Sequence, residues 1–157
     1  EFYIAAFGHF FISANPAEIA ALDANPAWNR TGESFVVNTT PAAGLAGVCR
    51  FFREFPQPSG PAKSSHFYAL QGLGCDELRA NPQGWQFEGI VFYMAPPDAT
   101  GGCPATMVPV FRLYNNGASG ASNHRYTTSE QVRADMLRDD WISEGAGERG
   151  VGMCAPQ

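Results

Sequence analysis

The chain of 157 residues has the length of one domain of ordinary size. Fifteen acidic residues outnumber ten basic ones, so the net charge is −5, and Lys63 is the sole lysine. Because no run of four basic residues occurs, we expect neither nucleic acid nor an anionic membrane as a partner. Glycine, proline or a charged residue interrupts the apolar stretches every few positions, so we expect no membrane insertion.

The cysteine content points to a location outside the cytosol. The four cysteines are even in number and include no CxxC pair, which argues against a zinc ribbon or a thioredoxin-like motif. The sequence starts at Glu1 without methionine, as a mature secreted fragment or a piece of a longer protein does. We therefore expect a secreted, extracellular or cell-surface protein with two disulfides.

The histidines, the tryptophans and one glycine of each repeat recur in register. The chain has only three histidines and three tryptophans, and each tryptophan is followed four residues later by a glycine. The markers are His9, His66 and His124, then Trp28, Trp85 and Trp141, then Gly32, Gly89 and Gly145. This pattern indicates one domain, residues 1–157, built from three repeats at approximately 1–40, 46–96 and 103–157.

The first repeat is predicted to contain a strand over 1–3 and a second strand over 9–13. A short helix follows, because Asn15 can cap it and Glu18 matches the pattern of a capping box. A closing strand then begins at Trp28 and passes through the marker glycine.

The other two repeats follow the same plan. The second repeat is predicted to have strands over 50–52, 66–70 and 85–94, with a weaker helix because two glycines precede it. The third is predicted to have strands over 112–114 and 124–128, a helix opening at 128–131 and a closing strand from Trp141. We therefore predict an α+β fold of three β-β-α-β repeats with pseudo-threefold symmetry, with an all-β, trefoil-like arrangement as the alternative.

Strand alternation predicts the buried side of the second strands. The predicted interior face carries His9, Phe11 and Ser13, then His66, Tyr68 and Leu70, then His124, Tyr126 and Thr128. The opposite face carries Phe10, Phe67 and Arg125, and the arginine favours partial contact of that face with solvent.

Three blocks of sequence carry a resemblance to a known family. They read WQFEGIVFY at 85–93, VFRLYN at 110–115 and NHRYTT at 123–128. Together they resemble the repeat family of secreted bacterial and fungal proteins catalogued as domain of unknown function 5648. The resemblance implies an extracellular module, often attached to hydrolases or cell-surface proteins, without an established activity.

The repeats differ at several positions. Glu1 stands where the other repeats have Arg50 and Arg112, and Thr31 stands where they have Glu88 and Glu144. The third repeat also carries an insertion at 146–150, which we expect to be a turn or a bulge.

Four cysteines allow three pairings. The repeat plan favours Cys49–Cys75, within the second repeat, and Cys103–Cys154, joining the two ends of the third.

Two catalytic interpretations compete with structural ones. His9, His66 and His124 could meet on a central axis as the three ligands of a hydrolytic zinc ion. We favour instead three buried structural histidines, and we predict no metal and no cofactor. Arg50, His66 and Glu88 recur as Arg112, His124 and Glu144, which we interpret as a polar network that holds strands together rather than as part of a hydrolase triad.

A binding role depends on aromatic and polar side chains. The predicted ligand-binding residues are Arg50, Arg112, Tyr114, Asn115, Asn123, Trp85 and Trp141. For the tryptophans, a place in the core is the favoured alternative. The loops at 54–65 and 115–123 are predicted contact surfaces, because loops on rigid scaffolds often carry recognition.

The sequence therefore predicts a non-catalytic secreted module that binds a cell-wall or other glycan, or a cell-surface polymer, and that accompanies a larger hydrolase or surface protein. The alternatives are a small metal-dependent hydrolase that uses the three histidines and a structural or adhesive repeat with no small ligand.

Overall fold

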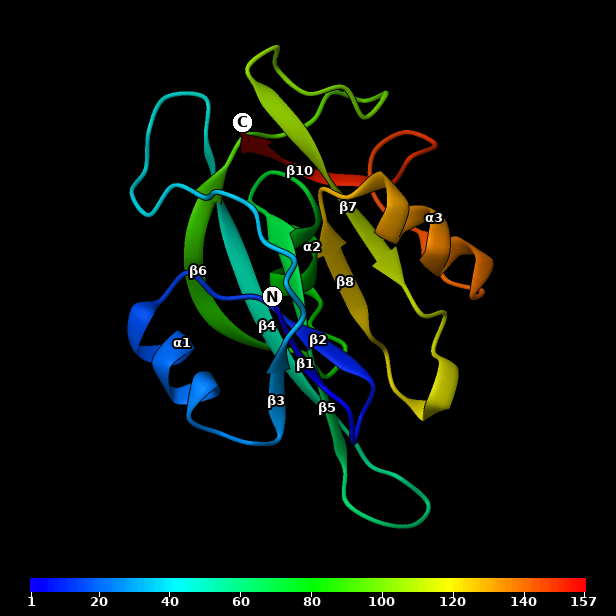
Figure 1. Ribbon diagram of the computed structural model, residues 1–157. Helices are drawn as coiled ribbons and strands as arrows, with labels where there is room; N and C mark the ends of the chain where they lie inside the picture. The colour runs from blue at the N-terminus through cyan, green and yellow to red at the C-terminus, as the bar shows by residue number, and fades with distance from the viewer.

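Three small antiparallel sheets make up most of the structure, a computed structural model that describes residues 1–157. Figure 1 shows the sheets packed around a shared centre. The first sheet has the order β2-β1-β3, from β1 (Phe2–Ile4), β2 (His9–Phe11) and β3 (Trp28–Arg30). The second has the order β5-β4-β6, from β4 (Ala46–Phe55), β5 (Lys63–Leu70) and β6 (Gln86–Met94).

The third sheet has the order β10-β7-β8, from β7 (Met107–Tyr114), β8 (His124–Thr127) and β10 (Val151–Pro156). A short strand, β9 (Ile142–Ser143), pairs with the same edge of β7 as β10 does. Between β9 and β10, Ala146 pairs with Val151 and the residues between them turn, so the inserted segment is a turn. The protein is a small single domain that is mostly β.

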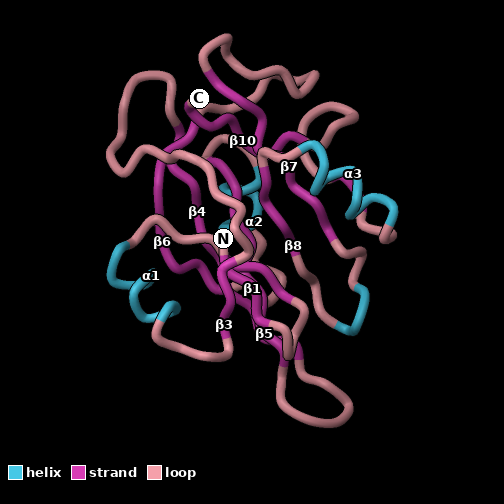
Figure 2. The backbone as a smooth tube through the Cα atoms, in the orientation of Figure 1, coloured by secondary structure: helices cyan, strands magenta, loops and turns pink.

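Each sheet has one short helix between its second and third strands: α1 (Pro16–Asp23), α2 (Gly74–Ala80) and α3 (Glu130–Arg138). A 3₁₀ turn also occurs at Ala118–Gly120. Figure 2 shows how little of the chain is helical. Asn15 caps α1 by accepting hydrogen bonds from the N–H groups of Ala17 and Glu18, and Ser129 caps α3. α2 has no side-chain cap.

The closing strands of the first and third sheets are shorter than predicted. β3 ends before Gly32 and β9 ends before Gly145, whereas β6 continues through Gly89 with register shifts on either side of Arg50. All three marker glycines have positive φ, of 89°, 135° and 147°, a conformation that other residues rarely adopt. Each glycine therefore marks a distortion of the chain and not regular strand.

The second strands β2, β5 and β8 are edge strands of their own sheets, and they meet one another at the centre of the molecule. Their main-chain groups on the unpaired side need partners there. The Tyr68 hydroxyl donates to the carbonyl of Ile12 (2.6 Å), and the Tyr126 hydroxyl donates to the carbonyl of Tyr68 (2.9 Å). The N–H of Tyr68 in turn donates to the Tyr126 hydroxyl at 2.8 Å. These bonds join the three sheets.

The strand register corrects the predicted equivalence of the three histidines. On one edge of the central strands, Tyr3, Phe52 and Tyr114 each pair with the residue that follows a marker tryptophan. On the other edge the same three residues pair with Phe10, His66 and His124. Phe10 therefore holds the place of a histidine in the first sheet, and His9 lies one residue earlier.

The predicted interior face of the first sheet is confirmed at His9 and Phe11, since both are buried and Phe10 between them is only half-buried. The central hydrophobic cluster contains Ile12, Tyr68 and Tyr126, one from each second strand or its continuation. His9 and Phe11 are buried too, but outside this cluster.

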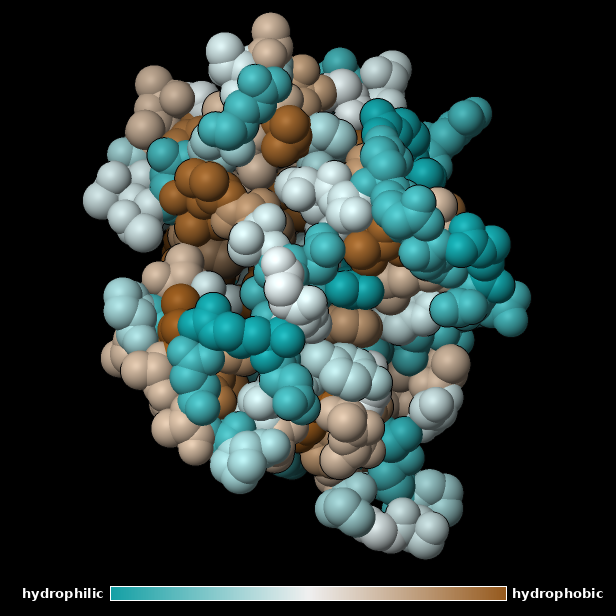
Figure 3. All heavy atoms as spheres, in the orientation of Figure 1, coloured by the Kyte–Doolittle hydropathy of each residue, from teal (hydrophilic) through white to brown (hydrophobic).

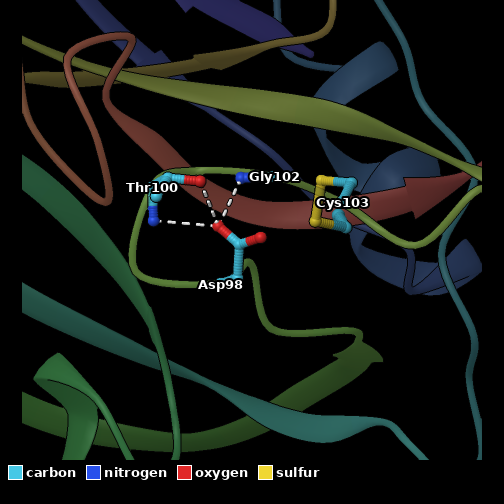
Figure 4. The surroundings of a disulfide bond; sticks show 5 residues. Asp98, Thr100, Gly102 and Cys103 are labelled. Atoms are coloured by element: carbon cyan, nitrogen blue, oxygen red, sulfur yellow. Dashed lines mark hydrogen bonds between the residues drawn. A yellow bond between two sulfur atoms is a disulfide. The ribbon is translucent and has the colours of Figure 1, made fainter.

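Two disulfides join Cys49 to Cys75 and Cys103 to Cys154, which is the pairing favoured by the repeat plan. Closing segments with separations of 26 and 51 residues stabilises the fold by ~3.5 and ~4 kcal/mol in the chain-entropy model. A turn leads into Cys103, where Asp98 accepts hydrogen bonds from Thr100 and from the N–H of Gly102 (Figure 4). No helix has the length and apolarity that a membrane span requires.

The central tyrosine bonds give a first prediction. Tyr126→Phe should lower the free energy of unfolding by about 1–3 kcal/mol, because it leaves the buried N–H and C=O of Tyr68 without their partner. Urea denaturation measures the change. Tyr114→Phe is the matched control, since its hydroxyl makes no hydrogen bond within the chain; equal stability of the two variants would contradict the assigned role.

Candidate functional site

Arg112, His124 and Glu144 converge between the strands of the third sheet. Arg112 comes from the centre of β7, His124 begins β8, and Glu144 follows β9. The Glu144 Oε2 atom lies 3.0 Å from Arg112 Nε and 3.2 Å from His124 Nε2. The Arg112 Nε–H itself is directed to the main-chain carbonyl of Glu144 at 3.1 Å. The cluster ties the three strands together at one point.

Burial and charge set the protonation of this cluster. Burial lowers the pKa of His124, although the contact with Glu144 opposes this shift. Burial opposes ionisation of Glu144, but the contacts with His124 and Arg112 outweigh it and hold the pKa of Glu144 below its usual value. At neutral pH the cluster therefore contains a charged arginine, a charged carboxylate and a neutral imidazole.

The second sheet has a similar cluster with one additional member. Arg50 Nε donates to Glu88 at 2.8 Å, and His66 Nε2 lies 3.4 Å from the same carboxylate. Arg50 Nη1 also donates to both carboxylate oxygens of Glu18, at 2.9 and 2.8 Å. Because Glu18 belongs to α1, this ion pair joins the first sheet's helix to the second sheet. It also explains why Glu18 does not complete the predicted capping box.

At the interface between the first and third sheets, an acidic residue and an arginine also pair, but the sheet that supplies each of them is reversed. The Glu1 carboxylate accepts hydrogen bonds from Arg125, with the shortest distance 2.9 Å. Phe2, which follows Glu1, pairs with Phe11. In the same way Phe51, which follows Arg50, pairs with Phe67. Leu113, which follows Arg112, pairs with Arg125. The acid thus occupies the place of Arg50 and Arg112, and the arginine occupies the place of the two phenylalanines.

An open groove of about 570 Å³ lies between the second and third sheets, and both Arg112 and Glu144 line it. Figure 1 shows α2, which forms one wall, between these two sheets. The other lining residues are Phe67, Gly74, Glu77, Leu78, Asn81 and Gln83. The Arg112 guanidinium lies 5.0 Å above the Phe67 ring, and no side chain or carbonyl accepts a hydrogen bond from its terminal nitrogens. Arg112 therefore presents free donors beside an aromatic ring.

The sequence predicts none of these six other lining residues as a ligand contact. Asn81 and Gln83 lie in a short segment after α2, far along the chain from the strands of the third sheet. Gln83 has a φ of +48°, which is uncommon for a residue with a side chain. The signal that the sequence offers here is the turn indicated by Pro82 and Gly84 on either side of Gln83.

Two of the predicted ligand-binding residues are structural instead. Asn115 is 8% exposed, and its side chain bonds four main-chain groups of the loop that it begins. Asn123 is 2% exposed and connects to the first sheet, donating to the carbonyl of Gly8 and accepting from the N–H of Phe10. Because both amides are buried and bonded within the chain, we remove them from the candidate site.

None of the aromatic candidates lines the groove, although Trp85 and Tyr114 pack near it. Trp85 is half-buried and packs 5.9 Å from the Phe67 ring and 6.5 Å from the His124 ring. Tyr114 stacks on His124 at 4.9 Å. Trp141 packs against Phe10 at another interface. Trp85 and Tyr114 therefore support the walls. Of the predicted arginines only Arg112 faces the groove, since Arg50 is paired with Glu18 and Glu88.

The three histidines occupy different environments. His9 forms a hydrogen bond through Nδ1 with the carbonyl of Ser64, whereas His66 and His124 lie against Glu88 and Glu144. No group of three or more histidine, cysteine, aspartate or glutamate side chains is placed to hold a metal ion. The three-histidine zinc site therefore lacks the convergence that it requires.

The protein is a small, disulfide-linked, mostly β domain with a polar groove between two of its sheets. The family model of the Domain of unknown function (DUF5648) matches residues 1–150. The chain belongs to this family, as the sequence blocks had indicated. Comparison with curated proteins and with solved structures found no match.

The histidines give a prediction about pH. Burial, together with the nearby Arg50 charge, lowers the pKa of His66 from 6.5 to about 4. The unfolded chain thus takes up a proton between pH 6.5 and 4 while the folded chain does not, so stability present above pH 6.5 is lost as pH falls through this window. The loss attributable to His66 amounts to at most about 3 kcal/mol.

Denaturation at several pH values tests this expectation. His66→Phe, which introduces the residue that Phe10 supplies in the first sheet, should flatten the pH dependence between 6.5 and 4. A variant with the unchanged slope would contradict the assignment. Arg138→Gln, on the exposed end of α3, is the control and should retain the slope of the parent protein.

Proposed function

We propose that this protein is a secreted, non-catalytic module that binds a glycan of a cell wall or cell surface in the groove between its second and third sheets. The main support for this proposal is that the Arg112 side chain lines the groove and that its terminal guanidinium nitrogens have no acceptor within the chain. Such donors, together with nearby amides, suit the hydroxyl groups of a sugar.

The lining supports a polar polymer better than an apolar ligand. Asn81 and Gln83 supply both donors and acceptors, Glu77 and Glu144 supply acceptors, and Phe67 supplies an aromatic surface near the arginine. The groove is open, so a chain longer than one sugar ring can extend past it. These features fit recognition of a surface-bound polymer.

We also infer that the three sheets are three copies of one β-β-α-β unit with pseudo-threefold symmetry. The support is the common element order and the common position of the marker tryptophans relative to the central strands. On this interpretation the groove is one of three related interfaces. It differs from the interface of the first and second sheets, where Glu18 pairs with Arg50.

The proposed location outside the cell is supported by the two disulfides and by the lack of free cysteines. Attachment to a larger hydrolase or surface protein is part of the same proposal. A role as an adhesive repeat without a small ligand is the outcome that remains if no glycan binds.

Binding to insoluble polysaccharides tests the proposal. The protein should be retained on at least one of peptidoglycan, chitin and cellulose, and Arg112→Gln should weaken retention about 10- to 100-fold, as expected for the loss of charge-assisted hydrogen bonds worth about 1.5–3 kcal/mol. Depletion of the protein from solution over a range of polysaccharide concentrations gives the affinity.

Arg138→Gln is again the matched control, because it removes an equal charge from the exposed end of α3 and does not line the groove. Asn81→Ala should also weaken retention without altering the unfolding transition. Absence of retention on all three polymers, or equal retention of Arg112→Gln and the parent, would count against the glycan site.

A further inference from the structure

The interface between the third and first sheets lacks a side chain that the other two interfaces contain. Tyr68 of the second sheet reaches the main chain of Ile12, and Tyr126 of the third reaches the main chain of Tyr68. The strand register puts Ile12 in the place of these tyrosines, because its neighbour Phe11 pairs with Phe2 as Phe67 pairs with Phe51. Isoleucine has no ring and no hydroxyl, so nothing equivalent reaches the main chain of Tyr126.

The main-chain groups of Tyr126 face this interface. Arg112, the partner of Tyr126 in β7, directs its own N–H to Gly150 and its carbonyl to Glu144, both on the far side of β7. The Arg112–Tyr126 pair is therefore a non-hydrogen-bonded pair of the ladder, and the N–H and C=O of Tyr126 point away from β7. The corresponding groups of Tyr68 point the same way and are bonded by the Tyr126 hydroxyl.

A pocket of about 160 Å³ lies at this interface, and Ile12 and Tyr126 both line it. Phe35, Val37 and Phe92 give it an apolar wall. The N-terminal ammonium group bonds the carbonyl of Glu33, and Thr127 donates to the Glu33 carboxylate, so the rim is held in place. Figure 1 shows the chain after β3 running past the N-terminus here, and the same face in Figure 3 is hollowed, with apolar side chains gathered above α1.

We propose that this pocket binds a single neutral phenolic ring from outside the chain. The ring takes the place of the missing tyrosine side chain against Ile12, Val37 and Phe92. Its hydroxyl donates to the carbonyl of Tyr126 and accepts from the N–H of Tyr126, as the Tyr126 hydroxyl does with Tyr68. The pocket shares no lining residue with the groove at Arg112, so the inference does not depend on the proposed glycan site.

Titration with p-cresol, followed by NMR of the full chain, tests the proposal. We expect saturable shifts with p-cresol and at least tenfold weaker binding of toluene, which has the ring but no hydroxyl. N-acetyltyrosinamide distinguishes the source of the phenol: binding of both phenols indicates the tyrosine side chain of a peptide, and binding of p-cresol alone indicates a free small phenol. No binding of either, or equal binding of toluene, would overturn the proposal.

The variant Ile12→Tyr restores the missing side chain. It should abolish p-cresol binding and raise the midpoint of thermal unfolding, because the new hydroxyl reaches the main chain of Tyr126. Val37→Phe enlarges another side chain that lines the pocket and should weaken p-cresol binding at least tenfold even if Ile12→Tyr does not fold. Unchanged p-cresol affinity in a folded form of either variant would contradict the site, and Arg138→Gln, at the exposed end of α3, should leave the affinity unchanged.

Discussion

The structure depends on satisfying the main chain of three edge strands that meet at its centre. An edge strand carries unpaired N–H and C=O groups, and burying them without partners costs free energy. Here β2, β5 and β8 all turn an unpaired edge toward the others. Two tyrosine hydroxyls, each acting as donor and acceptor, supply the partners that a continuous sheet would otherwise supply. The sheets can therefore stay small and separate while sharing one core.

The three interfaces around this centre have the same components in different arrangements. Arg50 and Arg112 lie above Phe11 and Phe67, whereas Glu1 pairs with Arg125 at the third interface. Side chains of Arg50 and Arg112 are exposed to nearly the same extent, 16% and 17%. Their difference is therefore one of partners: α1 brings Glu18 onto Arg50, and no residue of α2 accepts from Arg112. The contact with Glu18 therefore distinguishes the interface at Arg50 from the interface at Arg112.

Much of the local structure could be predicted because its causes are local. The cap at Asn15, the helix positions and the strands near the tryptophans follow from short-range patterns. The prediction that His9 is equivalent to His66 and His124 is wrong, because spacing along the chain cannot show a one-residue shift of register. Such a shift exchanges the faces of a strand. His9 has nearly the expected spacing, yet Phe10 occupies the equivalent place.

The binding groove could not be predicted for a different reason. Its residues come from two sheets, and their proximity depends on how those sheets pack rather than on any pattern within one repeat. Asn115 and Asn123 have the polarity expected of binding residues, but polar side chains next to edge strands also bond buried main-chain groups, which is what both amides do. In a domain with so many short strands, polarity alone does not separate a binding residue from a structural one. A side chain with free donors in an open groove does, and Arg112 meets that condition where Arg50 does not.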